Sequence, residues 1–463
     1  MPLVRRVRAA AVLTAVIAAT CALPAAADPA DAACVSGGRT LRYIVLFDPG
    51  TTPDAAQAEI TGSCGTTTVY YPQIAVAVAT ATDPGFADQI GPNRAFSAEA
   101  AVAKRAGSPR KADETQLAPR RTAIPATDRT GEQWDMTMIN AGAAHEVTEG
   151  SRNVVVGVLD SGIDDTHPDL RAAVDPSVSA GCLTGRPDIA PTAWSPSGSP
   201  HGTHVAGTIA AADDGKGITG VAPGVRVASV KVVDDDGHIY PEYAICGFMW
   251  AAQKKMTITN SSYFVDPWLF TCSKPGQRVV REALTRAVSY ATYEGVLNVA
   301  AATNENVDIA NPPDPSCRVL PAGLRGVLAV SSVGQDKVKA GYSAYGLGVI
   351  DVAAPGGEQK RRPDDPDSGC VLSTVPGGYA RFCGTSMAAP HVSGVLALLA
   401  STHPKASPAS LTRMLNNQAQ NLPCPADYDL SGTGTQDAYC SGYAPYNGFY
   451  GHGLVDALAA VSN

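Results

Sequence analysis

The sequence lacks several features that would assign it to other broad classes of protein. Charged residues make up only 17% of its 463 residues, and the formal net charge of −8 leaves no dominant basic patch. A chain without such a patch has no electrostatic reason to bind nucleic acid. Beyond the N-terminus, no apolar stretch reaches the roughly 18 residues that a membrane-spanning helix requires. We therefore expect neither a nucleic-acid partner nor a membrane anchor.

The N-terminus carries the pattern of a secretion signal. Arg5, Arg6 and Arg8 precede an apolar segment from Ala9 to Leu23, and residues 25–27 are three small alanines suited to cleavage. A membrane anchor is the alternative, but the apolar segment is short and the small-residue site argues against it. We expect residues 1–27 to be a signal peptide and the protein to be secreted and extracellular.

Cysteine usage agrees with export. The chain has 11 cysteines, and an even number remains once Cys21 leaves with the signal. In an exported protein this favours disulfides over free thiols. The sequence contains no Cys-x-x-Cys pair, so a zinc site of that kind is disfavoured. The eight cysteines after residue 133 allow 105 pairings, and closeness in sequence suggests Cys182–Cys246, Cys272–Cys317, Cys370–Cys383 and Cys424–Cys440.

A small unit is predicted ahead of the main domain. Residues 42–47, 69–71 and 74–78 read as strands, and Thr52 to Ile60 reads as a helix that Thr52 or Asp54 could cap. A Cys34–Cys64 disulfide could close this unit. The stretch from Ala98 to Arg129 is rich in Ala, Pro, Lys and Arg, which is typical of an exposed linker.

From about Gln133, continuous apolar runs alternate with helical segments. Such runs suit strands buried on both faces of a parallel sheet, and they occupy residues 154–159, 225–233, 256–259, 296–302, 327–333 and 349–353. Residues 240–254 and 279–293 read as helices between them. The fold class predicted is α/β, with a mostly parallel sheet and helices on both faces. Functional sites in such folds form at the carboxyl ends of the strands.

Ser386 has the sequence context of a nucleophile. It lies in Gly-Thr-Ser-Met-Ala-Ala-Pro-His, residues 384–391, and an apolar helical run follows. A serine in the first turn of a helix presents its hydroxyl beside N–H groups that have no partner within the helix. The same triplet could instead be a simple helix cap. Catalysis therefore requires a base, an orienting acid and an oxyanion donor elsewhere in the chain.

Three further segments offer those groups. Asp160 ends the first buried run in Asp-Ser-Gly, although that triplet is also typical of a turn. His201 opens His-Gly-Thr-His, where a metal-binding pair with His204 is conceivable, but no glutamate base lies between the two histidines as in zinc-protease helices. Asn304 follows the run ending at Ala302, where its amide could donate to an oxyanion.

These segments, in the order Asp160, His201, Ser386, resemble the subtilisin-like serine peptidases from about Gln133 to the C-terminus. The resemblance implies a Ser/His/Asp triad of those residues, with Asn304 as oxyanion donor and protein or peptide substrates. No cofactor is then needed for catalysis. It also implies that residues 28–105 are an inhibitory prodomain acting on the enzyme in the same chain, that residues 106–132 are a linker carrying the maturation cleavage, and that residues 133–463 are the peptidase domain.

The resemblance also suggests substrate-binding residues, with departures from the family pattern. Ser261, Ser262 and Tyr263 occupy the strand that pairs with extended substrates, where the family commonly has Ser-Leu-Gly-Gly, so we expect a bulkier, more aromatic rim. Phe264, which follows Tyr263, also replaces a family glycine, and the alternative is that both rings pack inward. Ala302 and Thr303 would line the pocket for the side chain preceding the cut bond. Thr303 replaces a glycine and should narrow that pocket.

A structural calcium ion is a further expectation from the resemblance. Carboxylates combined with loop carbonyls suit a hard cation. The expected ligands are side chains of Gln133, Asp169 and Asp214 and carbonyls of Ala212, Lys216 and Ile218. The alternative is a solvated Asp-Gly turn.

Two rival functions are weighed against the peptidase. A pseudoenzyme that only binds peptides is weakened by the presence of all triad and oxyanion residues. An esterase is disfavoured because Gly384 to Ala388 does not form the Gly-x-Ser-x-Gly elbow of those enzymes.

Overall fold

The computed structural model describes residue 34 and residues 38–104, 127–358 and 369–462. The predicted signal peptide and residues 105–126, which hold most of the predicted linker, lie outside the described residues. In the described ranges, no helix is both long enough and apolar enough to cross a membrane.

Residues 38–104 form a small α+β unit. Its elements are β1 (Leu41–Leu46), α1 (Pro53–Gly62), β2 (Gly65–Tyr71), β3 (Val76–Ala81), α2 (Phe86–Ile90), β4 (Ala95–Phe96) and α3 (Ala98–Lys104). The four strands form an antiparallel sheet in the order β2-β3-β1-β4. Thr52 caps α1, because its hydroxyl accepts the N–H of Ala55 at 3.3 Å. The strand–helix–strand–strand order predicted from the sequence is thus present, with α2, β4 and α3 added.

A seven-stranded sheet organises the remainder of the chain. Its strands are β5 (Val155–Asp160), β6 (Ala180–Gly181), β7 (Arg226–Lys231), β8 (Ile258–Ser261), β9 (Leu297–Ala301), β10 (Val327–Val333) and β11 (Ile350–Pro355). They lie in the order β11-β10-β9-β8-β5-β7-β6, and every neighbouring pair is parallel. This confirms the predicted mostly parallel sheet.

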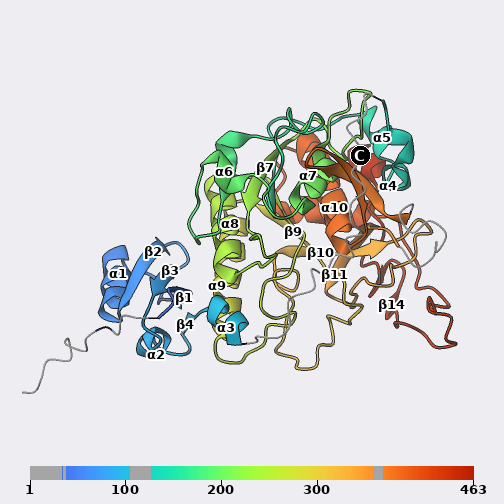
Figure 1. Ribbon diagram of the computed structural model, residues 1–463. Helices are drawn as coiled ribbons and strands as arrows, with labels where there is room; N and C mark the ends of the chain where they lie inside the picture. Colours follow the sequence, from blue (N-terminus) through green and yellow to red (C-terminus); the bar gives the residue numbers. More distant parts are fainter. Residues whose placement is uncertain (1–33, 35–37, 105–126, 359–368, 463) are drawn as a thin grey trace, which may run out of the picture. The chain divides into compact units, whose positions relative to one another are not determined.

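Helices cover both faces of this sheet (Figure 1). The helices α7 (His201–Ala210) and α10 (Thr385–Thr402) pack with Val156, Val158 and Val330 on one face. The helices α8 (Pro241–Gln253) and α9 (Gln277–Tyr293) pack with strand residues such as Val155 and Leu159 on the other. Because side chains alternate along a strand, each continuous apolar run feeds two cores at once.

Shorter elements complete the larger part of the chain. They are η1 (Thr130–Glu132), α4 (Trp134–Met138), α5 (Ala141–His145), η2 (Pro176–Val178), α6 (Pro191–Trp194), β12 (Val371–Val375), β13 (Gly378–Phe382), α11 (Pro408–Gln418), β14 (Gly442–Tyr443), β15 (Tyr446–Asn447) and α12 (Ala457–Val461). β12 and β13 form an antiparallel hairpin immediately before α10. This hairpin leads the chain into the segment that carries Ser386.

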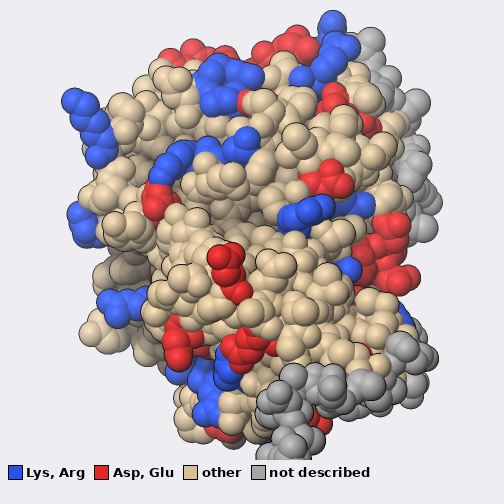
Figure 2. Space-filling view, turned by 90° about the vertical axis from the view of Figure 1, so that its left-hand side faces the viewer, with Lys and Arg blue, Asp and Glu red and all other residues tan. Residues whose placement is uncertain are grey.

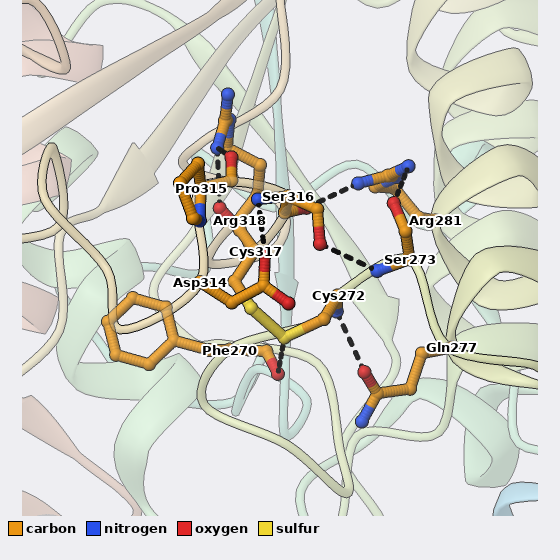
Figure 3. The surroundings of a disulfide bond; sticks show 10 residues. All are labelled: Phe270, Cys272, Ser273, Gln277, Arg281, Asp314, Pro315, Ser316, Cys317 and Arg318. Atoms are coloured by element: carbon orange, nitrogen blue, oxygen red, sulfur yellow. Dashed lines mark hydrogen bonds between the residues drawn. A yellow bond between two sulfur atoms is a disulfide. The ribbon is translucent and has the colours of Figure 1, made fainter.

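All four disulfides predicted after residue 133 are present: Cys182–Cys246, Cys272–Cys317, Cys370–Cys383 and Cys424–Cys440. Cys34 and Cys64 are also disulfide-bonded. Figure 3 shows the surroundings of the Cys272–Cys317 bridge, where the N–H of Cys272 donates to Gln277 Oε1 at 2.9 Å. In the described ranges, only Cys272, Asp314 and Cys317 group as three potential metal ligands. Because both sulfurs are bonded to each other, this group is not a metal site.

The N-terminal unit contacts α8, α9 and the loop around Gly185. Arg286 on α9 donates to the carbonyl oxygens of Phe47, Ile74 and Ala75 at 3.0, 3.2 and 3.4 Å. The Tyr71 hydroxyl donates to the carbonyl oxygen of Gly185 at 2.8 Å. On the face shown in Figure 2, cationic and anionic side chains are interspersed among uncharged ones.

Candidate active site

Three segments distant in the chain bring Asp160, His201 and Ser386 to one edge of the sheet. Asp160 is the last residue of β5, His201 the first of α7 and Ser386 the second of α10. All three are buried, with 1%, 5% and 6% of their surfaces exposed. Together with Asn304 they line one pocket of about 240 Å³. The structure therefore brings together the four residues that the sequence motifs singled out.

Asp160 orients the His201 ring. His201 Nδ1 lies 2.7 Å from Asp160 Oδ1, which also accepts the N–H of Ser161 at 2.7 Å. Because a carboxylate only accepts, Nδ1 carries the proton, which makes Nε2 the basic nitrogen of the neutral ring. Gly202 permits this approach, since an added Cβ there would lie 2.5 Å from the Gly162 carbonyl oxygen.

A proline in α10 deprives the Ser386 carbonyl oxygen of its usual helical hydrogen bond. Pro390 lies four residues further along the helix and has no N–H to offer the Ser386 carbonyl oxygen. The Ser262 hydroxyl donates to that oxygen at 2.9 Å. A side chain from the loop after β8 therefore fills the gap that the proline leaves, and it ties Ser386 to the pocket wall.

The Ser386 hydroxyl donates to the Ser262 carbonyl oxygen at 3.1 Å rather than to His201. The hydroxyl and the imidazole line the same pocket. In enzymes without substrate, the bond between nucleophile and base is often long or absent and forms in the complex. A rotation about the Cα–Cβ bond of Ser386 changes which acceptor its hydroxyl reaches.

Asn304 and the first turn of α10 border one corner of the pocket beside Ser386. Asn304 Oδ1 accepts the N–H and the hydroxyl of Thr385, both at 2.9 Å. These two donors fix the orientation of the amide, which makes Nδ2 its hydrogen-bond donor on the other side. A Cβ added to Gly384 would lie 3.3 Å from Asn304 Nδ2 and 3.6 Å from the backbone nitrogen of Ser386. Two N–H donors therefore border one small space beside Ser386, which glycine leaves open.

The predicted substrate-binding residues are divided between the pocket and the sheet. Ser262, Tyr263 and Thr303 line the pocket. Ser261 ends β8, where it pairs with Leu159 and Ala300 in the sheet. Ala302 is buried in the core beneath α8 and α9. Of the two predicted serines, Ser262 makes the contacts with Ser386.

Tyr263 and Phe264, two aromatic residues that line the pocket, differ in how deeply they are buried. Tyr263 is 8% exposed and packs into the core on the α8 and α9 side, and burial raises its pKa. Phe264 is only partly buried and lines the pocket. The alternative of inward packing therefore holds for Tyr263, whereas Phe264 supplies the aromatic rim.

An acidic loop lines the pocket and was missed by the sequence reasoning. Asp234, Asp235 and Asp236 follow β7 and line the same pocket as His201. Burial raises the pKa of Asp234, whose carboxylate accepts the N–H of His238 at 2.8 Å. The rule that sites form at the carboxyl ends of parallel strands could have found this loop.

The six predicted calcium ligands lie around one loop. Asp169 Oδ2 accepts the Ile218 N–H at 3.1 Å and the Tyr379 hydroxyl at 2.8 Å. Asp214 Oδ1 accepts the Lys216 N–H at 3.1 Å. Within the ranges that the structure describes, the carbonyl oxygens of Ala212, Lys216 and Ile218 accept no hydrogen bond.

Gln133 differs from the other five predicted calcium ligands, because its side-chain amide is hydrogen-bonded to the backbone. Its amide pairs with the backbone of Thr219, accepting the N–H and donating to the carbonyl oxygen, both at 2.9 Å. The two carboxylates and three carbonyls thus suit a hard cation, whereas the Gln133 amide oxygen is already used by an N–H.

Comparison with known proteins gives consistent matches. The subtilase family model matches residues 151–453. Fervidolysin from Fervidobacterium pennivorans is 33% identical over 326 residues, which cover 66% of this chain but only 42% of fervidolysin. Subtilisin BL from Lederbergia lenta is 34% identical over 306 residues, covering 66% of this chain and 96% of that protein.

A solved structure matches the fold of this chain over a larger part of its length. The crystal structure of the epidermin leader peptide processing serine protease from Staphylococcus aureus has a TM-score of 0.68 and 19% sequence identity. It covers 92% of this chain and 98% of that chain. This match confirms the predicted α/β fold class, and the small α+β unit ahead of the parallel sheet is seen in the structure of this chain.

Proposed function

The chain belongs to the subtilase family, and from that premise we propose that it is a secreted serine endopeptidase, made as a zymogen, that cleaves peptide bonds with Ser386, His201 and Asp160. The observation that carries this proposal is the corner beside Ser386, where Asn304 Nδ2 and the Ser386 N–H border the space left by Gly384. Such a pair of donors serves a reaction in which a carbonyl oxygen becomes negatively charged.

The geometry supports a stepwise acyl transfer. His201 Nε2 takes the proton of Ser386 as the Ser386 oxygen attacks the peptide carbonyl carbon. Asp160 holds the proton on Nδ1 and stabilises the imidazolium that forms. The oxygen of the tetrahedral intermediate lies between Asn304 Nδ2 and the Ser386 N–H. The imidazolium then protonates the leaving amine, and water, deprotonated by His201, hydrolyses the acyl-enzyme.

The proposal assigns residues 28–105 as an inhibitory prodomain. The contacts of Arg286 and Tyr71 tie the unit of residues 38–104 to the peptidase part. Cleavage within residues 106–132 would cut the covalent connection between this unit and the peptidase part. The unit would then act as an inhibitor of the enzyme from the same chain. Export is proposed from residues 1–27 together with the disulfides, which are typical of oxidising compartments.

We also propose a structural calcium ion at the loop after α7. The carboxylates of Asp169 and Asp214 and the carbonyls of Ala212, Lys216 and Ile218 would hold it, and the ion would neutralise two acidic groups. Calcium at about 100 times its dissociation constant should stabilise the fold by about 3 kcal/mol. Thermal unfolding of the Ser386→Ala protein in calcium and in EGTA tests this. A midpoint that does not change, or an Asp169→Asn variant that responds like the parent, contradicts the site.

The experiment that tests the proposed function is intact mass of the purified proprotein over time, beside a Ser386→Ala variant. We expect the parent chain to lose an N-terminal fragment ending within residues 106–132, while the variant stays whole. A serine-directed phosphonate should label the parent chain and not the variant. A parent chain that is neither processed nor labelled contradicts the proposal and favours a pseudoenzyme.

A further inference from the structure

Thr303 is unfavourable in two respects, its backbone conformation and the burial of its hydroxyl. It directly precedes Asn304, is 5% exposed and lines the pocket with Ser386. The inference drawn from it below rests on the proposed peptidase function. It goes beyond that function by naming the side chain that the pocket selects.

The first cost is in the backbone. Thr303 has φ = +100°, a region that glycine enters readily and that a β-branched residue almost never adopts. The segment is held there by its surroundings. The Thr303 carbonyl oxygen accepts the Ala344 N–H at 3.0 Å, and Asn306, also at positive φ, donates its N–H to the Tyr342 carbonyl oxygen at 2.7 Å. Strain of this kind concentrates at functional sites.

The second cost is in the side chain. Thr303 Oγ1 is buried and has no hydrogen-bond partner within the ranges that the structure describes. Buried hydroxyls are nearly always paired, because removing one from water without a partner is unfavourable. A bound group that donates to or accepts from Thr303 Oγ1 would remove this cost. The hydroxyl is therefore placed to recognise a polar group of the substrate.

The reaction geometry identifies which substrate group that is. The acyl carbon bonds to Ser386, and its oxygen points to the space beside Gly384 between Asn304 Nδ2 and the Ser386 N–H. The remaining substituent of the acyl carbon is the Cα of the residue before the cut bond. Thr303 is the chain neighbour of Asn304 and lines the same pocket, so we expect the substituents of that Cα to lie next to Thr303.

We propose that Thr303 makes the enzyme selective for peptides whose residue before the cut bond has a small hydrogen-bonding side chain, with serine as the best fit. The methyl group and Cβ of Thr303 occupy room that a glycine would leave open, which excludes large side chains. The hydroxyl pairs with the substrate hydroxyl, which favours serine over alanine. A site built to bond a hydroxyl discriminates against the analogue that lacks it.

The test is the ratio of kcat/KM for two peptides that differ only by Ser or Ala before the cut bond. The parent enzyme should prefer the Ser peptide roughly tenfold, which one hydrogen bond can supply. Thr303→Val keeps the shape and removes the hydroxyl, so the ratio should fall to near one. Thr303→Ser keeps the hydroxyl and should retain the preference. Thr303→Gly should lose the preference and accept a Leu peptide.

The outcomes distinguish a failure of this inference alone from a failure of the proposed function. Active sites are counted by phosphonate labelling, so a partly misfolded variant does not distort the ratio. A labelled enzyme that cuts both peptides equally, or a Thr303→Val variant that still prefers Ser, overturns the inference and leaves the peptidase function standing. An equal fall for both peptides in Thr303→Val also overturns it. Absence of labelling and of cleavage in the parent chain overturns both.

Discussion

Gly384 is the residue at which the smallest addition to the chain should most affect catalysis. Its backbone is extended, with φ 164° and ψ 160°, so alanine can adopt the same conformation. The added methyl group would fill the space between Asn304 Nδ2 and the Ser386 nitrogen, at 3.3 and 3.6 Å. We predict that Gly384→Ala lowers kcat by roughly 10²- to 10³-fold, as the loss of an oxyanion donor does. Steady-state peptide hydrolysis measures this.

A matched glycine provides the control for that prediction. Gly142 lies in α5, and a Cβ added there would meet nothing within 4 Å. Gly142→Ala should therefore fold and hydrolyse peptides as the parent does. If Gly384→Ala kept the parent kcat, the oxyanion would not lie where the two donors converge, and the proposed corner would be wrong.

Residue types at the site were predictable from the sequence, but their conformations were not. The motifs identified Asp160, His201, Ser386 and Asn304, because those side chains carry recognisable chemistry. Ser261 and Ser262 were both predicted to bind substrate, but only tertiary packing decides that Ser262 lies against Ser386 while Ser261 pairs within the sheet. The positive φ of Thr303 was not predicted, although the glycine that the family has at this position is the residue that enters this region most readily.

At the scale of elements, long apolar runs were predicted well and short segments poorly. The strand predicted at residues 327–333 is β10 itself, and the other buried runs agree within a few residues. These runs are specified locally by continuous burial. β6 has two residues and β4 has two, so each is defined by its partner strand and not by its own sequence. The β12–β13 hairpin likewise depends on cross-strand contacts.

The Cys370–Cys383 bridge should affect both stability and catalysis. It closes a loop with a sequence separation of 13 and ends at the residue before Gly384. Replacing both cysteines by serine should lower the free energy of unfolding by about 3 kcal/mol. Freeing the approach to α10 should also lower kcat, by up to roughly 100-fold, because small displacements of catalytic groups are costly. Urea unfolding in a Ser386→Ala background and peptide hydrolysis measure the two effects.

The Cys424–Cys440 bridge is a close control, because its sequence separation is 16. Its removal should lower stability by a similar amount, about 3 kcal/mol. It adjoins no residue of the proposed triad, so kcat should stay at the parent value. Equal losses of kcat in the two double variants would show that the Cys370–Cys383 bridge has no special role in placing Ser386.

At the scale of the whole molecule, the N-terminal unit supplies a cation to a buried acid of the peptidase part. Glu242, in the first turn of α8, is 1% exposed, and Arg42 of β1 lies 3.8 Å from its carboxylate. Arg42 also contacts Glu99 at 3.3 Å and the Tyr243 hydroxyl at 3.1 Å. This pairing links residues about 200 positions apart, so no local sequence pattern could have predicted it.

Burial dominates the titration of Glu242 and makes the stability of the folded chain depend on pH. Burial raises its pKa to about 7 from an ordinary 4.5, although the Arg42 cation acts in the opposite direction and Glu99 adds to the rise. A raised carboxyl pKa favours the folded state at low pH. That contribution is complete below pH 4.5 and is lost as the pH rises through 7. Ionised Glu242 should then cost about 3 kcal/mol above pH 8.

Glu242→Gln imitates the protonated acid at every pH, so it isolates this cost. In a Ser386→Ala background, we predict that the variant and its parent differ by a constant amount below pH 4.5. Between pH 5 and pH 8 the variant should become progressively more stable than the parent, by about 3 kcal/mol in total. Urea unfolding across this range measures the difference, and Glu149→Gln, at an exposed carboxylate, should show no such trend. Parallel stability curves for Glu242→Gln and its parent would mean that Arg42 fully compensates the buried charge, because a paired carboxylate would already be ionised throughout this range.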